Sequence, residues 1–243
     1  MRVLLKISYL GSAYHGWQVQ PNGITIQETM QNALESLYKF RPNLTGCSRT
    51  DAGVHANEFY CHYDTDAFIP EKGVVAGLNI ALPSDIAVLE CRYVDDDFHA
   101  RYSARAKNYV YRIYNNDIPN PFLEGRVWRI SRKLNIDLMN EFAKCLIGTH
   151  DFIGFSSSGR TVSGTVRTIT ECNLTKNGDE IHLSVTADGF LYNMVRIIAG
   201  TAVEVSDGKI DSKYISKIIK SKDRSLAGIT APPDGLYLNK VIY

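Results

Sequence analysis

The stretch Arg2-Val3-Leu4-Leu5-Lys6-Ile7-Ser8-Tyr9 opens the chain with alternating side chains. Alternate residues from Val3 to Tyr9 are apolar, which is the pattern of a β-strand with one buried face. The segment Thr25-Ile26-Gln27-Glu28 then forms a capping box that predicts the start of a helix. The apolar residues of this helix recur at helical spacing: Ile26, Met30, Ala33, Leu34 and Leu37.

Further strands of the first half are predicted near residues 44–48, at 59–63 and after Pro83. In the last of these, Ala87, Leu89, Cys91 and Tyr93 would lie on one side of the strand. Strand, helix and strands in this order favour an α+β fold. We place this first half at residues 1–105.

A second half, at residues 106–243, repeats the order of strand, helix and strands. Residues 108–115 and 181–187 alternate as strands, and the chain ends on a strand at 236–243. Helices are expected over 138–146, with Gly148 as the C-terminal cap, after the turn at Asp188, and around 211–220. The apolar residues of the first of these helices are Leu138, Phe142, Cys145 and Leu146.

The composition is that of an ordinary globular protein, with 44% hydrophobic and 22% charged residues. No apolar run reaches the roughly 18 residues of a membrane helix, and the N-terminus lacks the apolar core of a signal peptide. Five widely spaced cysteines predict a reduced, cytoplasmic protein without structural disulfides.

The net charge of +1 argues against unselective nucleic-acid binding by the whole surface. Two basic runs without acids stand out, at 101–112 and 126–133, and they include Tyr102, Tyr109, Tyr111 and Trp128. Such runs are either solvated faces or a groove that follows phosphates. The interleaved aromatic residues favour the groove.

The segment Gly46-Cys47-Ser48-Arg49-Thr50-Asp51-Ala52-Gly53-Val54-His55-Ala56 places an Arg-x-Asp pair among small, turn-forming residues. Asp51 in such a segment is either a turn residue that bonds its own backbone or a carboxylate displayed for chemistry. An ionised carboxylate can act as nucleophile or as proton acceptor.

Arg-Thr-Asp-Ala-Gly-Val-His at 49–55 resembles the signature of the TruA family of tRNA pseudouridine synthases, whose Asp is catalytic. Segments at 78–86, 98–101, 107–111, 148–152, 166–169, 190–196 and 231–238 resemble family segments in family order. The stretch Ser156 to Gly164 matches poorly, and we expect a mobile loop there. Gly46-Cys47-Ser48 also departs from the Gly-Ala-Gly that the family often shows.

The resemblance implies one role for each of four residues. Asp51 would be the catalytic carboxylate, and Arg49 would contact the RNA at the flipped nucleotide. Tyr109 would contact the flipped base, although a strand tyrosine can equally be a core residue. Arg196 would pair with Asp51 and keep it ionised, although on an apolar helix it could also form a structural salt bridge.

The resemblance further implies two ferredoxin-like halves with joined antiparallel sheets and an active site in the cleft between them. It implies isomerisation of uridine at positions 38, 39 and 40 in the anticodon stem-loop of tRNA, by a homodimer. The reaction exchanges no electrons and carries no group, so we expect no metal and no small-molecule cofactor. The chain agrees, since it contains no phosphate-binding glycine loop and no metal-ligand pair at helical spacing. Because no apolar run is long enough for a membrane helix, we also expect no membrane partner.

Two other functions remain open at this point. A non-catalytic RNA-binding module would use the basic groove and would not need Asp51. A glycoside hydrolase needs two carboxylates, and the best second candidate, Asp188, stands in an Asp-Gly turn. A zinc nucleobase deaminase is excluded because the chain lacks His-x-Glu with Pro-Cys-x-x-Cys.

Overall fold

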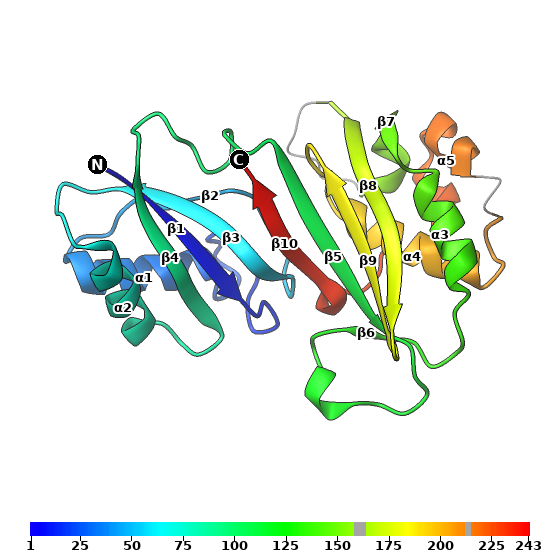
Figure 1. The fold of residues 1–243 in the computed structure, drawn as a ribbon, viewed down its shortest axis with the longest axis horizontal. Coiled ribbons are helices and arrows are strands. Elements are labelled where there is room, and N and C mark those ends of the chain that lie inside the picture. The colour runs from blue at the N-terminus through cyan, green and yellow to red at the C-terminus, as the bar shows by residue number, and fades with distance from the viewer. Residues whose placement is uncertain (158–163, 212–214) are drawn as a thin grey trace. The chain divides into compact units, whose positions relative to one another are not determined.

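A computed structural model describes residues 1–157, 164–211 and 215–243 of the chain. That part contains ten strands and five α-helices, so the predicted α+β class is confirmed (Figure 1). In chain order they are β1 (Arg2–Tyr9), α1 (Ile26–Tyr38), β2 (Thr45–Gly46), β3 (His55–Asp64), α2 (Glu71–Ala81), β4 (Ile86–Val94), β5 (Ala106–Tyr114), β6 (Trp128–Arg129), α3 (Ile136–Lys144), β7 (Gly148–Asp151), β8 (Val166–Asn177), β9 (Glu180–Ala187), α4 (Met194–Ser206), α5 (Ile215–Ser221) and β10 (Leu236–Ile242).

The chain forms two compact units. The first comprises Met1–Arg105 together with Leu238–Tyr243, and the second comprises Ala106–Tyr237. The last six residues thus lie with the first unit, whereas the sequence pattern assigned them to the second half. Asn57 donates a hydrogen bond to Asn239, and the ring of Tyr60 meets that of Tyr243 edge-on at 5.2 Å. Contacts between distant residues of this kind leave no local pattern in the sequence.

The first unit has the connectivity β1–α1–β2–β3–α2–β4 and the strand order β4-β1-β3, with β2 paired to β3. These pairs are antiparallel, and the arrangement is ferredoxin-like. Helix α1 begins as the capping box predicts, because the Thr25 side chain accepts a hydrogen bond from the Glu28 amide. Helix α2 was not predicted, because Gly73 and Gly77 lower the helix propensity of this segment.

In strand β4 the predicted buried face is wrong at Leu89, which is 49% exposed. The register between β1 and β4 pairs Lys6 with Glu90 and Ile7 with Val88, so Leu89 is the extra residue of a β-bulge. A bulge shifts the side-chain alternation by one residue. Val88 is therefore buried and Leu89 points to solvent.

The second unit has the strand order β5-β9-β8-β7, and these neighbours pair in antiparallel fashion. The two-residue strand β6 pairs with β5 in parallel, which differs from the expectation of purely antiparallel sheets. The alternating residues of β9 from Ile181 to Ala187 are fully buried, as predicted. The predicted strand at 108–115 is observed as β5, with Tyr109 and Tyr111 buried.

Two expectations for helix α3 are wrong. Cys145 is exposed, and Met139 and Ala143 are buried with Phe142 instead. Gly148, expected to cap this helix, has a φ of +118° and starts β7. Helix α3 already ends at Lys144, with Cys145 as its C-cap.

Helix α4 is buried on nearly every side, from Met194 to Val205. The helix begins only at Met194, so Leu191, expected on it, precedes it. The charged helix expected around 211–220 corresponds to α5, and its residues 212–214 lie outside the described part of the chain. Most of the expected loop at Ser156 to Gly164 also lies outside it, at 158–163.

Candidate active site

Asp51 lies in the loop between β2 and β3 of the first unit and is half-buried. The loop forms a turn in which the Val54 amide donates to the Asp51 carbonyl oxygen at 3.2 Å. Gly53, within that turn, has a φ of +81°, a conformation that favours glycine. The local sequence therefore folds as the turn that its composition predicts, with the Asp51 carboxylate at its start.

The backbone on both sides of Asp51 is bound to one segment, Gly11–Trp17, which follows β1. The Trp17 amide donates to the Thr50 carbonyl oxygen at 3.1 Å, and the Gly53 amide donates to the Tyr14 carbonyl oxygen at 3.2 Å. These two bonds fix the backbone immediately before Asp51 and two residues after it. We call Gly11–Trp17 the support segment.

Two glycines let the support segment approach this closely. A Cβ added to Gly16, whose φ is +81°, would lie 2.4 Å from the Thr50 carbonyl oxygen and 3.1 Å from the carbonyl carbon of Asp51. A Cβ added to Gly11 would lie 2.0 Å from the Val54 carbonyl oxygen. Neither position has space for a side chain, so the position of the Asp51 loop depends on both glycines.

Side-chain hydrogen bonds also hold the support segment and the Asp51 loop in place. The Tyr9 hydroxyl and the Thr50 hydroxyl form a hydrogen bond of 3.0 Å, and the Gly11 amide donates to Nδ1 of His55 at 2.9 Å. The Tyr14 hydroxyl donates to Asp85 at 2.7 Å. Burial, with this bond to a carboxylate, raises the pKa of Tyr14, so the phenol stays a donor.

The sequence interpretation did not identify the support segment as part of the site. The available signal was the pair Gly11 and Gly16, which flanks Tyr14 in an irregular stretch after a strand. Glycine in such a place often marks a close backbone approach. Arg49, by contrast, was predicted, and its side chain is exposed on the Asp51 loop, two residues before the carboxylate.

Tyr109 lies on β5 in the second unit, opposite Val185 of β9, and is only 6% exposed. Its ring meets the ring of Phe190 edge-on, with centroids 5.0 Å apart. Aromatic pairs favour this geometry. The ring of Tyr109 is therefore held in place by a packed neighbour.

Arg196 lies in the first turn of α4, also in the second unit. Its Nε donates to the Ala231 carbonyl oxygen at 2.7 Å, and its Nη1 donates to the Asn193 side chain at 2.9 Å. The Ala231 amide donates back to the Arg196 carbonyl oxygen at 3.1 Å. The guanidinium is thus anchored to the segment after α5 and to the residue before α4.

The four predicted residues fall into two pairs by unit. Asp51 and Arg49 share one loop of the first unit, and Tyr109 and Arg196 belong to the second. The rival second carboxylate, Asp188, accepts a hydrogen bond from the Thr168 amide at 3.0 Å. That bond ties the turn after β9 to β8, so Asp188 has a structural role.

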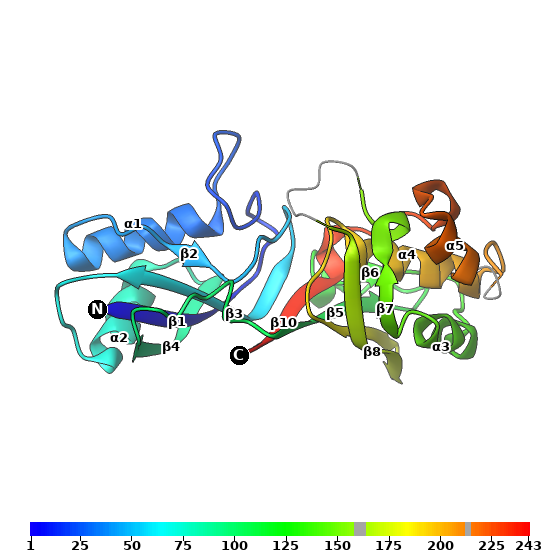
Figure 2. The same ribbon diagram turned by 90° about the horizontal axis from the view of Figure 1, so that it is seen from above.

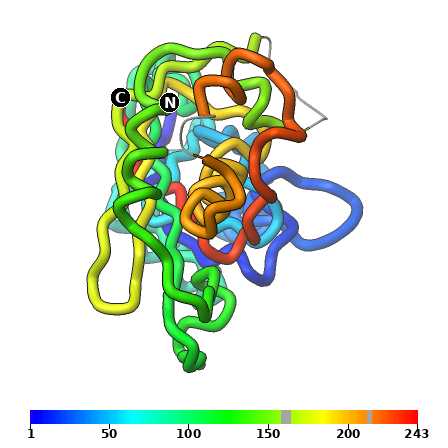
Figure 3. The backbone as a smooth tube through the Cα atoms, turned by 90° about the vertical axis from the view of Figure 1, so that its right-hand side faces the viewer, coloured from blue at the N-terminus to red at the C-terminus, as the bar shows by residue number. Residues whose placement is uncertain are grey.

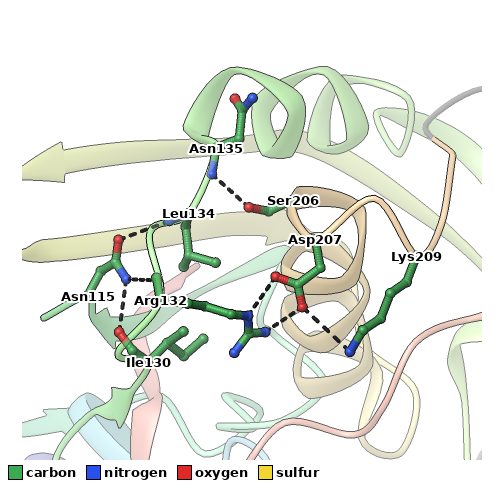
Figure 4. Close-up of polar contacts among 8 residues, drawn as sticks. All are labelled: Asn115, Ile130, Arg132, Leu134, Asn135, Ser206, Asp207 and Lys209. Carbon is green, nitrogen blue, oxygen red and sulfur yellow. Dashed lines mark hydrogen bonds and ion pairs between the residues drawn. The ribbon is translucent and has the colours of Figure 1, made fainter. Parts of the chain in front are cut away.

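Two basic residues of the predicted runs are also structural. Arg112 forms an ion pair with Glu180 at 2.7 Å. Arg132 forms one with Asp207 at the end of α4, and Figure 4 shows it beside the bond from the Asn135 amide to Ser206. The first pair joins β5 to β9, and the second joins the segment before α3 to the end of α4. Neither arginine is therefore an open phosphate contact.

The described residues contain no group of three or more His, Cys, Asp or Glu side chains that could hold a metal ion. Within the same residues, no helix has both the length and the hydropathy needed to cross a bilayer.

Comparison with known proteins defines the class. Residues 142–243 match the family model for tRNA pseudouridine synthase. The tRNA pseudouridine synthase A of Thermoanaerobacter sp. (strain X514) is 47% identical over 241 residues, and that of Acetivibrio thermocellus is 45% identical, each alignment covering 99% of both chains. The Staphylococcus saprophyticus protein of the same name is 42% identical, over 99% of this chain and 90% of that one.

This chain belongs to the tRNA pseudouridine synthase A family and is an isomerase that converts uridine to pseudouridine in tRNA. Among solved structures, a chain from the crystal structure of a Cbf5-Nop10-Gar1 complex reaches a TM-score of 0.35 at 10% identity, over 97% of this chain and 57% of that one. A similarity this low carries no argument.

Proposed function

We propose that the enzyme isomerises uridines at positions 38, 39 and 40 in the anticodon stem-loop of tRNA, with Asp51 as its catalytic carboxylate. One observation carries the assignment of Asp51. Its backbone is fixed on both sides by hydrogen bonds to the support segment, and Gly16 leaves no free space beside it. A loop fixed this closely around a half-buried carboxylate suits chemistry that depends on geometry.

The reaction breaks the bond between N1 of uracil and the sugar, turns the base, and joins C5 to the same sugar carbon. The proton on C5 is then lost and N1 gains one, so atoms and charge balance without an oxidant or a metal. One ionised carboxylate at the reacting carbon can serve as nucleophile or proton acceptor. Asp51 supplies that group in this proposal.

Two of the remaining three residues contact the RNA, and the third acts on Asp51. The flipped base rests against Tyr109, whose ring is already held by Phe190. Arg196 keeps Asp51 ionised, because a guanidinium close to a carboxylate favours its charged form. Arg49, exposed on the catalytic loop, binds the RNA where the nucleotide leaves the stack, through phosphate or base stacking.

We also propose that the enzyme acts in the cytoplasm as a homodimer. The five free cysteines agree with a reducing compartment. Light scattering on the purified chain tests the dimer directly, and a monomer at working concentration would contradict it.

The test of the catalytic assignment is tritium release from tRNA transcripts labelled at uridine C5. We expect wild type to release tritium and Asp51→Asn to be at least 100-fold slower, because an amide is neither nucleophile nor base. The variant should still fold and bind tRNA in a gel shift. Asp97→Asn, an exposed carboxylate of the same unit, is the matched control and should keep full activity.

An Asp51→Asn rate less than 100-fold below that of wild type would refute the role of Asp51. Transcripts with a single target uridine test the positions, and release from uridines outside 38, 39 and 40 alone would refute the proposed target.

A further inference from the structure

A second loop of the first unit continues directly from the support segment. It comprises Gln18–Ile24 and leads into α1. Figures 2 and 3 show this blue segment projecting away from the helices and strands of its own unit. Every residue of it except Gly23 is exposed, and the apolar side chains of Val19 and Ile24 are 45% and 63% exposed.

Hydrogen bonds fasten both ends of this loop. At its start, the Gln27 amide donates to the Trp17 carbonyl oxygen at 2.9 Å, and the Val19 amide donates to the Gln27 side chain at 3.0 Å. At its end, the His15 amide donates to the Ile24 carbonyl oxygen at 2.8 Å. The loop therefore presents its side chains from a fixed base.

The base of this loop also supports Asp51. Trp17, which precedes Gln18, donates through its amide to the Thr50 carbonyl oxygen, and Gly16 abuts Thr50 and Asp51. Two residues, Trp17 and Thr50, and the hydrogen bond between them thus link the backbone of Gln18 to that of Asp51. RNA bound at Asp51 therefore lies near the base of the exposed loop.

The chemistry of the loop favours bases over phosphates. Gln18-Val19-Gln20-Pro21-Asn22-Gly23-Ile24 contains no charged residue, so it lacks the cations that dominate the attraction to phosphates. Amide side chains can hydrogen-bond base edges as well as phosphates, and apolar groups pack on base faces. Exposed amides and exposed apolar carbons are both present here, on a loop of seven residues.

We propose that the Gln18–Ile24 loop contacts nucleobases beside the target uridine and helps to select which uridine is modified. The amides of Gln18 and Asn22 hydrogen-bond base edges, and Val19 and Ile24 pack on base faces. This inference rests on the proposed role of Asp51, since it is the nearness to that residue that places RNA at the loop.

The test uses two double variants of the whole enzyme, Gln18→Ala/Asn22→Ala and Val19→Ala/Ile24→Ala. Tritium release is measured on transcripts with one target uridine each, over a range of salt concentrations. Ile80→Ala is the control, because Ile80 is 87% exposed on α2. All substituted side chains are exposed, so the thermal midpoint should stay at the wild-type value.

We expect kcat/KM to fall about tenfold on at least one transcript and to change by a different factor on the others. The slope of log kcat/KM against log salt should stay the same, because no phosphate contact is lost. Equal values for wild type and variants, or an equal fall on every transcript, would overturn the inference.

Failure of this inference is separable from failure of the proposed function. If wild type modifies uridines other than 38, 39 and 40, the proposed target is wrong. The same variants are then compared on the uridines that wild type does modify, and unchanged relative rates there would overturn the loop inference alone.

Discussion

Asp51 and Arg196 are positioned in opposite ways. Asp51 lies on a loop of the first unit, and its backbone is held by another loop through backbone hydrogen bonds and two glycines. Arg196 lies on a buried helix of the second unit, and its own side chain makes the anchoring bonds, to Ala231 and Asn193. The position of the Asp51 carboxylate depends on the close fit of two backbone segments. The position of the Arg196 guanidinium depends on its own hydrogen bonds and on the packing of helix α4.

This difference predicts which substitutions each site tolerates. A loop held by close backbone approach is sensitive to a single added methyl group at a glycine, even where no side chain touches the substrate. A residue held by bonds from its own side chain loses its function when that head group is removed. The experiments below test the roles of Gly16 and Arg196. They then compare a buried histidine and a pair of asparagines in the two units.

The largest effect is expected for Gly16→Ala. The new methyl group would lie 2.4 Å from the Thr50 carbonyl oxygen at a φ of +81°, so the backbone of the Asp51 loop must move. A misplacement of about 1 Å can cost roughly 100-fold in rate. We expect kcat to fall by about that factor while the Kd for tRNA changes little, as measured by single-turnover kinetics and filter binding.

Gly178→Ala is the control for Gly16→Ala. Its φ is +58°, yet nothing lies within 4 Å of the added Cβ. It carries the conformational cost of a left-handed alanine without the clash and should keep wild-type kcat. If both variants kept full activity, the support segment would have no positioning role.

For Arg196→Met we expect kcat to fall 10- to 100-fold with tRNA affinity within about threefold, since its proposed partner is Asp51 and not phosphate. Arg132→Met is the matched control because it also removes a bonded arginine from the second unit. The Arg132 side chain is 52% exposed and Lys209 also pairs with Asp207, so the substitution should lower the free energy of unfolding by about 1 kcal/mol and leave kcat unchanged. A large loss of affinity with intact turnover in Arg196→Met would show that the assigned role is wrong.

The units also differ in a buried histidine. His62 of the first unit is 5% exposed, whereas the side chain of His182 in the second is 40% exposed. Burial, with Arg2 and His99 nearby, lowers the pKa of His62 to about 4, while Asp64 opposes this shift. The folded state therefore binds this proton less readily than the unfolded state, and stability is lost as pH falls from about 6.5 towards 4.

At pH 4.5 this group should lower the free energy of unfolding by about 2 to 3 kcal/mol relative to pH 7.5. Urea unfolding at both pH values measures it. His62→Gln, whose amide oxygen can replace Nδ1 as acceptor for the Ala100 amide, should show a loss smaller by that amount. An identical pH dependence in the variant would exclude His62 as the source.

The smallest effects on stability are expected for two asparagines, one in each unit, that bond from a helix to the backbone of a strand. Asn79 of α2 bonds both the amide and the carbonyl of Val88 in β4, and Asn140 of α3 does the same to Leu174 in β8. Each asparagine side chain thus makes the two hydrogen bonds that the backbone of a neighbouring strand would make. We expect Asn79→Ala and Asn140→Ala each to cost about 1 to 2 kcal/mol of unfolding free energy, measured in urea.

Asn79→Asp and Asn140→Asp refine this comparison, since each keeps the acceptor and loses the donor. Each should cost less than the corresponding alanine. A loss of stability from the alanine substitution in one unit only would show that β4 and β8 do not depend equally on these asparagine bonds.

Elements with a strong local period could be predicted from the sequence. The strand at Arg2–Tyr9, the capped start of α1 and the buried alternation of β9 were all predicted correctly. The errors concern features whose cause lies elsewhere in the chain. Leu89 is exposed because of a bulge opposite β1, and Gly148 starts a strand that pairs with β8.

The sequence by itself determined the α+β class and, through its family signature, the family and the candidate residues Asp51, Arg49, Tyr109 and Arg196. Those depend on periodicity and on short motifs, which are local. Only the tertiary structure revealed that Gly11 and Gly16 hold the Asp51 loop, because a backbone contact between residues 34 or more positions apart leaves no periodic trace. For the same reason the sequence did not show that the last six residues belong to the first unit, because their contacts are with distant residues such as Asn57.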